Sequence, residues 1–400
     1  MSEILNVGGK PLRDNTITKK QYLTYSPYTS SYGHNDEVRI VIQSQDQYVL
    51  PSESYILVDV KVSRKTDASH ANAAGTWTTF PAHRLFSEMR YELNNTEIDR
   101  IKIPGLTSYM KSQTATPVDV LREINQMINY DSQALTNRVY SMIIPLCSVF
   151  GFCEDYQKVL INARHELVLV RSRSNNSVYT CATDSFNIEV TKIQWKVPHI
   201  QLSDHAKYAM LKYLERKQTI TVPYRSWDLY EMPSLPQTDK NIWTVKSSTQ
   251  ASKPRYVLFV LQTARHGLAT RADMFDHCNV TDVKLYLNSE CFPYENYNSN
   301  FTVGNCQDLY NAFAKIQSSY YNGTKPHNPY TYNYETFKSQ PIFAFDCSRT
   351  DDSLLGGAVD IRLEINSSAQ IAADTAAYCL IIYENEFEYS SFSGIVVKSV

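Results

Sequence analysis

The sequence predicts an all-β protein made of two tandem, eight-stranded antiparallel sandwiches with short inserted helices. Three observations support this prediction. The 400 residues include 29 tyrosines and only 12 glycines, and strand-favouring residues are more frequent than helix-forming blocks. Short segments alternate between apolar and polar side chains, as half-buried strands do. The second half of the chain also repeats the order of segments found in the first half.

Residues 1–36 have no hydrophobic period, which predicts an extended amino-terminal arm. A helix is expected at 117–129, because Thr116 is a suitable N-cap, Pro117 fits the first helical position and apolar residues recur three and four apart. The rest of the first half contains alternating segments that we interpret as strands, at 37–42, 55–62, 88–93, 140–146, 165–170 and 188–195.

A second helix is expected at 202–217, where Ser203 is a suitable cap and cations stand in the last turn. Residues 219–222 then begin a new set of strands. We therefore place the first sandwich at 37–217, closing on this helix, and the second sandwich with its carboxyl-terminal tail at 218–400.

The internal repeat is weak in identity but keeps its order and spacing. Residues 89–94 match 283–288 at an offset of 194, and 165–169 match 359–363 at the same offset. A helix follows the Leu-Asn strand in each half, at 117–129 and at 307–318. This order favours duplication over a chance alignment of two β domains. The long connections between strands are typical of the jelly-roll form of sandwich.

Composition excludes several classes of protein. The 39 basic and 41 acidic side chains nearly balance, which argues against a strongly cationic nucleic-acid coat. No apolar stretch reaches the roughly 18 residues of a membrane span. Residues 1–5 lack the pattern of a secretory signal, so we expect a protein that is made inside the cell and not secreted, with its eight cysteines reduced.

Two stretches of the chain resemble a known family. IPLCSVFGFC at 144–153 and LINARHELVLVR at 160–171 are similar to segments of double jelly-roll major capsid proteins, and YCLIIY at 378–383 resembles their final strand. The family includes tectivirus-like phages, adenovirus-like and Polinton/adintovirus-like elements and virophages. The two stretches within 144–171 are similar to those of Polinton-like and insect-associated virus capsid proteins. The resemblance covers roughly 37–390. The first 36 residues match nothing in the family, and the chain is shorter than many members, which implies modest surface towers.

The resemblance implies a structural protein of the virion. Three copies would form a pseudo-hexagonal homotrimer, which would contact neighbouring capsomers and a minor capsid or penton protein in an icosahedral shell. Residues 96–138 and 289–339 would then be crown loops or contacts between subunits. Tyrosine suits such contacts, and the candidates are Tyr109, Tyr130, Tyr320, Tyr321, Tyr330 and Tyr332.

The amino-terminal arm is the best candidate for contact with nucleic acid, or with an inner membrane, on the inside of the shell. It combines phosphate-pairing cations with rings that stack on bases, namely Lys10, Arg13, Lys19, Lys20, Tyr22 and Tyr25. The alternative interpretation is a tail that links neighbouring subunits.

The sequence contains no phosphate-binding loop, dinucleotide fingerprint, zinc-protease motif or nucleophile elbow. His277-Cys278 has no second ligand pair at metal spacing, Asp351-Asp352 is typical of a solvated turn, and His165-Glu166 lies in an alternating strand. We therefore expect no catalytic residue, metal or cofactor. Two alternatives stay open: an enzyme of the glycan-releasing amidase type on the same scaffold, and a pair of carbohydrate- or protein-binding modules.

Overall fold

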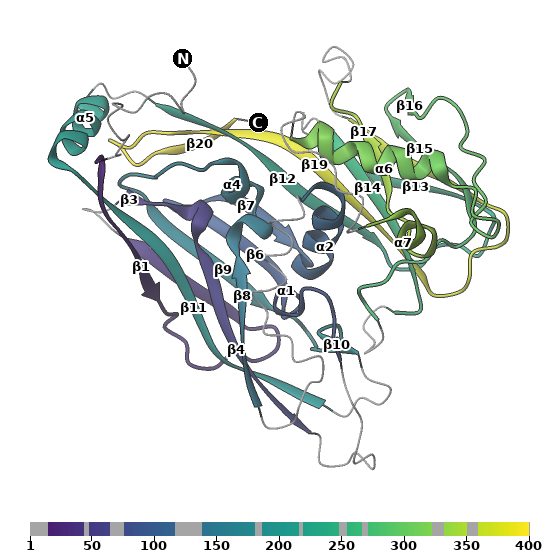
Figure 1. Cartoon of the computed structure of the whole chain (residues 1–400), viewed down its shortest axis with the longest axis horizontal. Coiled ribbons are helices and arrows are strands. Elements are labelled where there is room, and N and C mark those ends of the chain that lie inside the picture. Colours follow the sequence, from purple (N-terminus) through teal and green to yellow (C-terminus); the bar gives the residue numbers. More distant parts are fainter. Residues whose placement is uncertain are drawn as a thin grey trace, which may run out of the picture.

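The computed structural model describes residues 15–43, 48–64, 76–116, 138–180, 186–215, 219–247, 254–265, 271–321, 332–349 and 359–399. Two β-sandwiches lie side by side, and helices occupy the region between them (Figure 1). The predicted all-β class with short inserted helices is confirmed. Among the described residues, no helix has the length and apolar character needed to cross a membrane.

The first sandwich is built from two antiparallel sheets. One has the order β1–β11–β4–β8, with bounds Ile17–Tyr25, Phe186–Leu202, Tyr55–Arg64 and Arg138–Pro145. The facing sheet has the order β2–β9–β6–β7, with bounds Glu37–Gln43, Arg164–Arg171, Phe86–Leu93 and Thr96–Lys102. Short strands β3 (Tyr48–Val49), β5 (Thr76–Trp77) and β10 (Tyr179–Thr180) add local pairings.

The second sandwich has the same construction. Its first sheet has the order β12–β19–β14–β17, with bounds Ile220–Met232, Thr375–Tyr389, Pro254–Thr263 and Phe343–Asp346. The facing sheet has the order β13–β18–β15–β16, with bounds Lys240–Lys246, Ile361–Ser367, Val280–Leu287 and Glu290–Phe292. Strand β20 (Val396–Ser399) pairs with the end of β19.

The two sandwiches share one strand order. With eight strands numbered along each half, both halves have sheets in the order 1-8-3-6 and 2-7-4-5, which is the jelly-roll arrangement. In the first half Leu93 lies opposite His165, and in the second half Leu287 lies opposite Ile361. His165 therefore corresponds to Ile361, two residues from the match made by sequence. A shift of two keeps every side chain on its predicted face, because strands have a period of two.

The predicted arm is partly wrong. Residues 17–25 form β1, which pairs along β11 and is the first strand of the first sandwich. The sequence does not reveal this strand because β1 lies at a sheet edge, where most of its side chains are exposed and no strict alternation is needed. The helix expected at 117–129 lies outside the described residues. The helix found in this region is α2 (Pro104–Ala115), which begins with proline and is buried on nearly every side.

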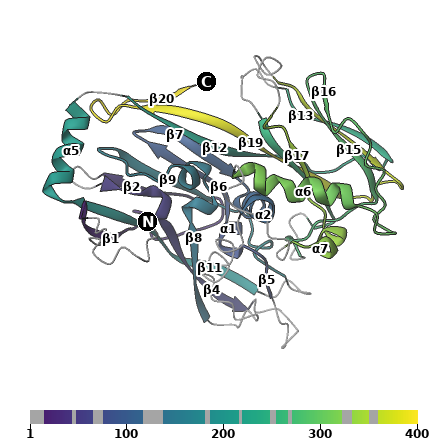
Figure 2. The same cartoon turned by 45° about the horizontal axis from the view of Figure 1, so that its top comes forward.

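The remaining helices agree better with expectation. Helix α5 (Asp204–Glu215) lies within the predicted 202–217, and the amide of Ala206 donates to the Ser203 hydroxyl that caps it. Helix α6 (Gln307–Tyr320) matches the helix expected at 307–318. In Figure 2, α5 lies at the end of the first sandwich that is far from α6. The shorter helices are α1 (Pro81–Arg84), α4 (Gly151–Asp155) and α7 (Tyr334–Ser339), with 3-10 turns at Pro51–Glu53 and Leu146–Ser148.

One hydrophobic cluster runs through both sandwiches. It includes the inward side chains of every long strand together with buried residues of α2, α4 and α6. Strands β12 and β19 are long enough to reach from the second sandwich over β7 and α4 of the first (Figure 1). The two halves therefore share apolar contacts that bury surface in both, which favours a fixed arrangement over independent domains.

Candidate functional site

A cluster of charged and aromatic side chains joins the two sandwiches. Its centre is the ammonium group of Lys111 on α2, whose side chain is only 3% exposed. This group forms an ion pair with Glu154 of α4 and lies 4.9 Å from the centre of the Trp227 ring and 5.3 Å from that of Tyr320. An ammonium ion that is shielded from water needs such partners, because burial without them costs several kcal/mol.

The carboxylate of Glu154 collects donors from both halves of the chain. Besides Lys111, it accepts hydrogen bonds from the hydroxyls of Tyr320, at 2.9 Å, and Tyr321, at 2.7 Å. Burial alone would raise the pKa of Glu154, but the charges of Lys111 and Arg225 hold it below its usual value. Glu154 is therefore ionised at neutral pH and binds α6 of the second sandwich to α4 of the first.

Arg225 on β12 makes the second ion pair of the cluster. Its guanidinium group binds both carboxylate oxygens of Asp155, and its backbone amide donates to Asp155 Oδ2 at 2.9 Å. The same group lies 3.5 Å from the centre of the Tyr320 ring and donates to the Tyr320 carbonyl at 2.7 Å. A planar guanidinium that is paired on its edge and stacked on its face has little freedom to move. We call these residues the junction cluster: Lys111, Glu154, Asp155, Arg225, Trp227, Tyr320 and Tyr321.

Gly151 explains why the backbones approach so closely at this junction. A Cβ atom at this position would lie 1.7 Å from the carbonyl oxygen of Arg225. Only glycine lets the start of α4 lie directly against β12. Gly151 belongs to the stretch 144–153 that carried the family resemblance, so at least part of that stretch serves the junction.

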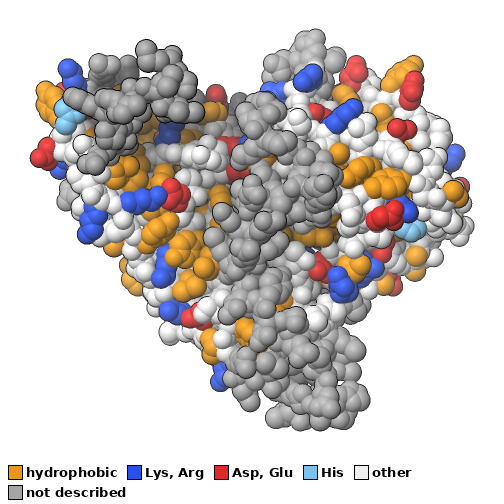
Figure 3. All heavy atoms as spheres, in the orientation of Figure 1, with side chains coloured by type: hydrophobic (Ala, Val, Ile, Leu, Met, Phe, Trp, Pro, Cys, Tyr) orange, Lys and Arg blue, Asp and Glu red, His pale blue; other side chains and the backbone are white. Residues whose placement is uncertain are grey.

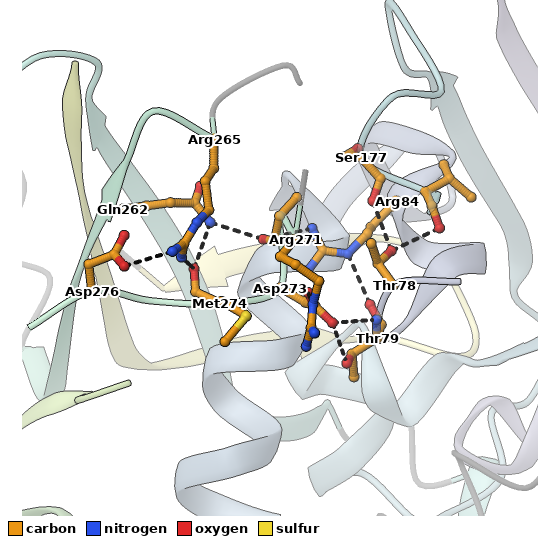
Figure 4. Close-up of polar contacts among 12 residues, drawn as sticks. Thr78, Thr79, Arg84, Ser177, Gln262, Arg265, Arg271, Asp273, Met274 and Asp276 are labelled. Carbon is orange, nitrogen blue, oxygen red and sulfur yellow. Dashed lines mark hydrogen bonds and ion pairs between the residues drawn. The ribbon is translucent and has the colours of Figure 1, made fainter. Parts of the chain in front are cut away.

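A second polar contact joins the halves near α1. Asp273 lies in the loop after β14, and its Oδ2 accepts hydrogen bonds from the Thr79 amide at 3.1 Å and the Thr79 hydroxyl at 2.9 Å (Figure 4). Arg84 donates to the carbonyl of Thr79 in its own half at 2.9 Å and to that of Ala272 in the other half at 3.3 Å. Burial alone would raise the pKa of Asp273, but its hydrogen bonds with Thr79 and the charge of Arg84 have the larger effect. The pKa of Asp273 therefore lies below its usual value.

A third contact lies between β7 and β12. The Tyr224 hydroxyl donates to the carbonyl of Ile98 at 2.7 Å, and the buried Asp99 accepts from the backbone amides of Phe152 and Arg100. Burial raises the pKa of Asp99 to about 7. The halves thus meet at the junction cluster, near α1 and along β7 and β12, and these contacts together oppose rotation of one sandwich against the other.

The tyrosines predicted as contacts between subunits have other roles. Tyr109, Tyr320 and Tyr332 are less than 8% exposed, so the prediction is wrong for these three. Tyr109 packs on Phe275 of the second half at 5.5 Å between ring centres. Tyr321 is partly buried, and its hydroxyl binds Glu154. The physical reason is that helices α2 and α6 pack against each other, which places their aromatic side chains inside one chain. Tyr130 and Tyr330 lie outside the described residues.

The predicted nucleic-acid contacts are only partly described. Lys10 and Arg13 lie outside the described residues. Lys19, Lys20 and Tyr22 are exposed on β1, where Lys20 forms an ion pair with Glu53. Tyr25 is turned inward, and its hydroxyl lies 2.9 Å from Nε2 of His199. On the face drawn in Figure 3, basic and acidic side chains are interspersed and form no patch of one sign.

The remaining candidate motifs are structural where they are described. His165 is buried, and its Nδ1 lies 2.7 Å from the Tyr91 hydroxyl, while Glu166 pairs with Arg39 and Arg164. His277-Cys278 lies in a loop of the second sandwich, and the residues Asp351-Asp352 lie outside the described part. Within the described residues, no three His, Cys, Asp or Glu side chains are grouped to hold a metal ion.

The comparisons with known proteins agree with this architecture. A family model described as a double jelly roll-like domain matches residues 79–386. A chain of the Sputnik virophage aligns with a TM-score of 0.67 at 11% identity, covering 100% of this chain and 92% of that chain. The Faustovirus major capsid protein aligns with a TM-score of 0.62 at 9% identity, covering 96% and 92%.

The mavirus major capsid protein aligns with a TM-score of 0.53 at 11% identity, covering 95% of this chain and 90% of that one. A search of curated protein sequences finds no match. Identities this low establish a shared fold, and the family model, which spans more than half of the chain, establishes the family. The chain belongs to the double jelly roll-like domain family.

Proposed function

We propose that this chain is a major capsid protein, three copies of which form a pseudo-hexagonal capsomer of an icosahedral viral shell. The observation that carries the proposal is the pair of sandwiches with one strand order, held together by contacts at the junction cluster, near α1 and between β7 and β12. Three such chains around a threefold axis present six similar sandwiches, so a single gene product fills a six-cornered tile.

The capsid proteins of virophages and giant viruses to which the fold is similar support this role. Within this lineage we propose a place near the Polinton/adintovirus-like members, on the strength of residues 144–171. The role is structural, not enzymatic, because the buried charged groups of the junction cluster are paired with one another rather than presented to a substrate.

The proposed partners are other copies of the chain, first in the trimer and then between capsomers, together with a minor capsid or penton protein. We place the division between the two jelly rolls between α5 and β12. Residues 1–14 and the edge strand β1 are proposed to face the interior, where Lys10, Arg13, Lys19 and Lys20 would contact genome or membrane through weak, salt-sensitive attraction.

Light scattering on the purified protein tests this function. We expect a species of three times the 45.9 kDa of one chain, which assembles further in some conditions of salt and concentration. A protein that stays monomeric at high concentration across a range of salt would exclude the capsomer. Such a monomer would favour the enzyme or binding-module alternatives.

A further inference from the structure

An open pocket lies at the loop end of the second sandwich and has no role in the junction cluster. Its volume is about 610 Å³, within the range of small-molecule sites. Its walls come from the end of β14, the loop before β15, helix α7 and the turn between β18 and β19. Its lining includes Asp276, His277, Asn279, Lys338, Gln370 and Ala372.

The charges around this pocket cancel in pairs. Asp276 pairs with Arg265 at 2.7 Å (Figure 4), and its Oδ2 also accepts from the Thr263 amide. Lys338 pairs with Glu335 at 3.1 Å on α7. With each charge balanced by a neighbour, the lining offers no net attraction to an anion or a cation. The favoured ligand is therefore neutral.

The same lining is rich in groups that bind hydroxyls. Asn279 and Gln370 supply planar amides, each with donors and an acceptor. The backbone amide of Asn279 donates to His277 Nδ1 at 3.0 Å, which leaves Nε2 as the donor of that ring. His277 lies flat on Phe301, with 5.3 Å between ring centres and 9° between planes. A flat ring and side-chain amides in one pocket lining suit a sugar, whose ring carries an apolar C–H face and equatorial hydroxyls.

The backbone beside the pocket is strained. Ala264, next to the lining residue Thr263, has φ 51°, and Cys278 has φ 43°. These left-handed values are uncommon for residues with a Cβ atom, and such strain concentrates at functional sites. The comparable strained residues Phe80 and Ile103, with φ 57° and 45°, begin helices α1 and α2 at the contacts between the halves. At the pocket, as at the contacts between the halves, the surrounding structure therefore holds residues in backbone conformations that cost free energy.

We propose that this pocket binds a neutral saccharide. The imidazole of His277 packs against the C–H face of the sugar ring, and Asn279 and Gln370 bind its hydroxyls. This goes beyond the shell-forming role, because a saccharide site concerns what the surface of the molecule recognises. Its failure would leave the oligomeric state, and hence the capsid proposal, untouched.

Saturation-transfer NMR with the full-length protein tests the site, using D-glucose, D-galactose, D-mannose and N-acetyl-D-glucosamine as probes. We expect transfer to at least one probe, at least a tenfold loss of affinity in Gln370→Ala, and loss of the signal in Ala372→Trp, which fills the pocket. Gln370 and Ala372 are exposed turn residues, so both variants should keep the wild-type melting temperature. Gln201→Ala, an exposed glutamine on the first sandwich, is the matched control and should bind as the wild type does.

Two results would overturn the proposal. One is the absence of transfer to all four probes from folded wild-type protein. The other is transfer that Ala372→Trp leaves unchanged, which would place the sugar elsewhere on the molecule.

Discussion

Among the described residues, two networks of ion pairs differ in their surroundings. The junction cluster lies between the sandwiches, where the side chain of Lys111 is 3% exposed and that of Glu154 is 14% exposed. The second network, which we call the surface ladder, lies on the outer face of the sheet β2–β9–β6–β7 and includes Glu37, Arg39, Glu88, Arg90 and Arg100.

Burial decides what these networks contribute. In the surface ladder Arg39 and Glu37 are 50% and 40% exposed, so water and salt screen their attraction and either partner can be lost at little cost. In the junction cluster, the loss of one partner leaves the other partner's charge buried without a counterion and shielded from water. The junction is therefore where the chain is sensitive to substitution, although both networks use the same residue types.

Removing the carboxylate at the centre of the junction should have the largest effect. We expect Glu154→Ala to lower the free energy of unfolding by about 3–5 kcal/mol, because Lys111 would remain buried without its counterion. Urea denaturation of the variant and the wild type measures this loss. Replacing both partners, as in Lys111→Met with Glu154→Leu, should recover most of the stability. A loss below about 1 kcal/mol in Glu154→Ala would mean that the junction is no more sensitive than the surface.

Crowding the close approach at the junction should have the next largest effect. Gly151→Ala places a methyl group against the Arg225 carbonyl and should cost about 1–3 kcal/mol through the displacement of α4 from β12. Gly33→Ala is the control, since its added methyl group would meet the side chain of Asp36, which can move aside. Thermal denaturation measures the melting temperatures of both variants, and that of Gly151→Ala should be the lower. Equal melting temperatures would contradict the packing described for α4.

The raised pKa of Asp99 predicts that the stability of the protein depends on pH. Because burial raises its pKa to about 7, its stabilising contribution is complete below about pH 4 and is lost as the pH rises through 7. The charged groups that act on it are Asp228 and Lys398. The melting temperature of the wild type relative to Asp99→Asn should rise by a few degrees from pH 8 to pH 5. A constant difference over this range would contradict the shifted pKa.

Two buried histidines give the stability a pH dependence of the opposite sign. Burial lowers the pKa of His83 and of His165 to about 3, so their contribution is complete above pH 6.5 and is lost as the pH falls toward 3. The comparison with Asp99→Asn removes this background, because both proteins contain the same histidines.

Neutralising a charge of the surface ladder should have the smallest effect. We expect Glu37→Gln to change the free energy of unfolding by less than about 1 kcal/mol and to matter still less at high salt. Urea denaturation at low and high ionic strength measures the change. A loss as large as that of Glu154→Ala would show that exposure does not separate the two networks.

Much of the fold was predictable because most strands have one buried face. Strands β2, β4, β6 and β15 alternate in the sequence and were placed within a few residues. Strand β1 was missed because its position at a sheet edge leaves most of its side chains in water. The duplication could be read from the order of segments, although the match of His165 was two residues away from its true counterpart.

The junction cluster was not predicted because it depends on contacts between residues far apart in the chain. Sequence alone could not show that Tyr320 would lie under Arg225, 95 residues away. One signal was present: Lys111 is the single charged residue in the twelve of α2, and a lone cation in an otherwise uncharged helix suggests a buried partner.

Electron cryo-microscopy of the purified assembly tests the central claim most directly. The account predicts particles with three chains around a threefold axis, in which six sandwiches alternate between first and second halves and each chain keeps the junction described above. Particles that contain single chains, or chains whose two sandwiches adopt variable angles, would contradict it.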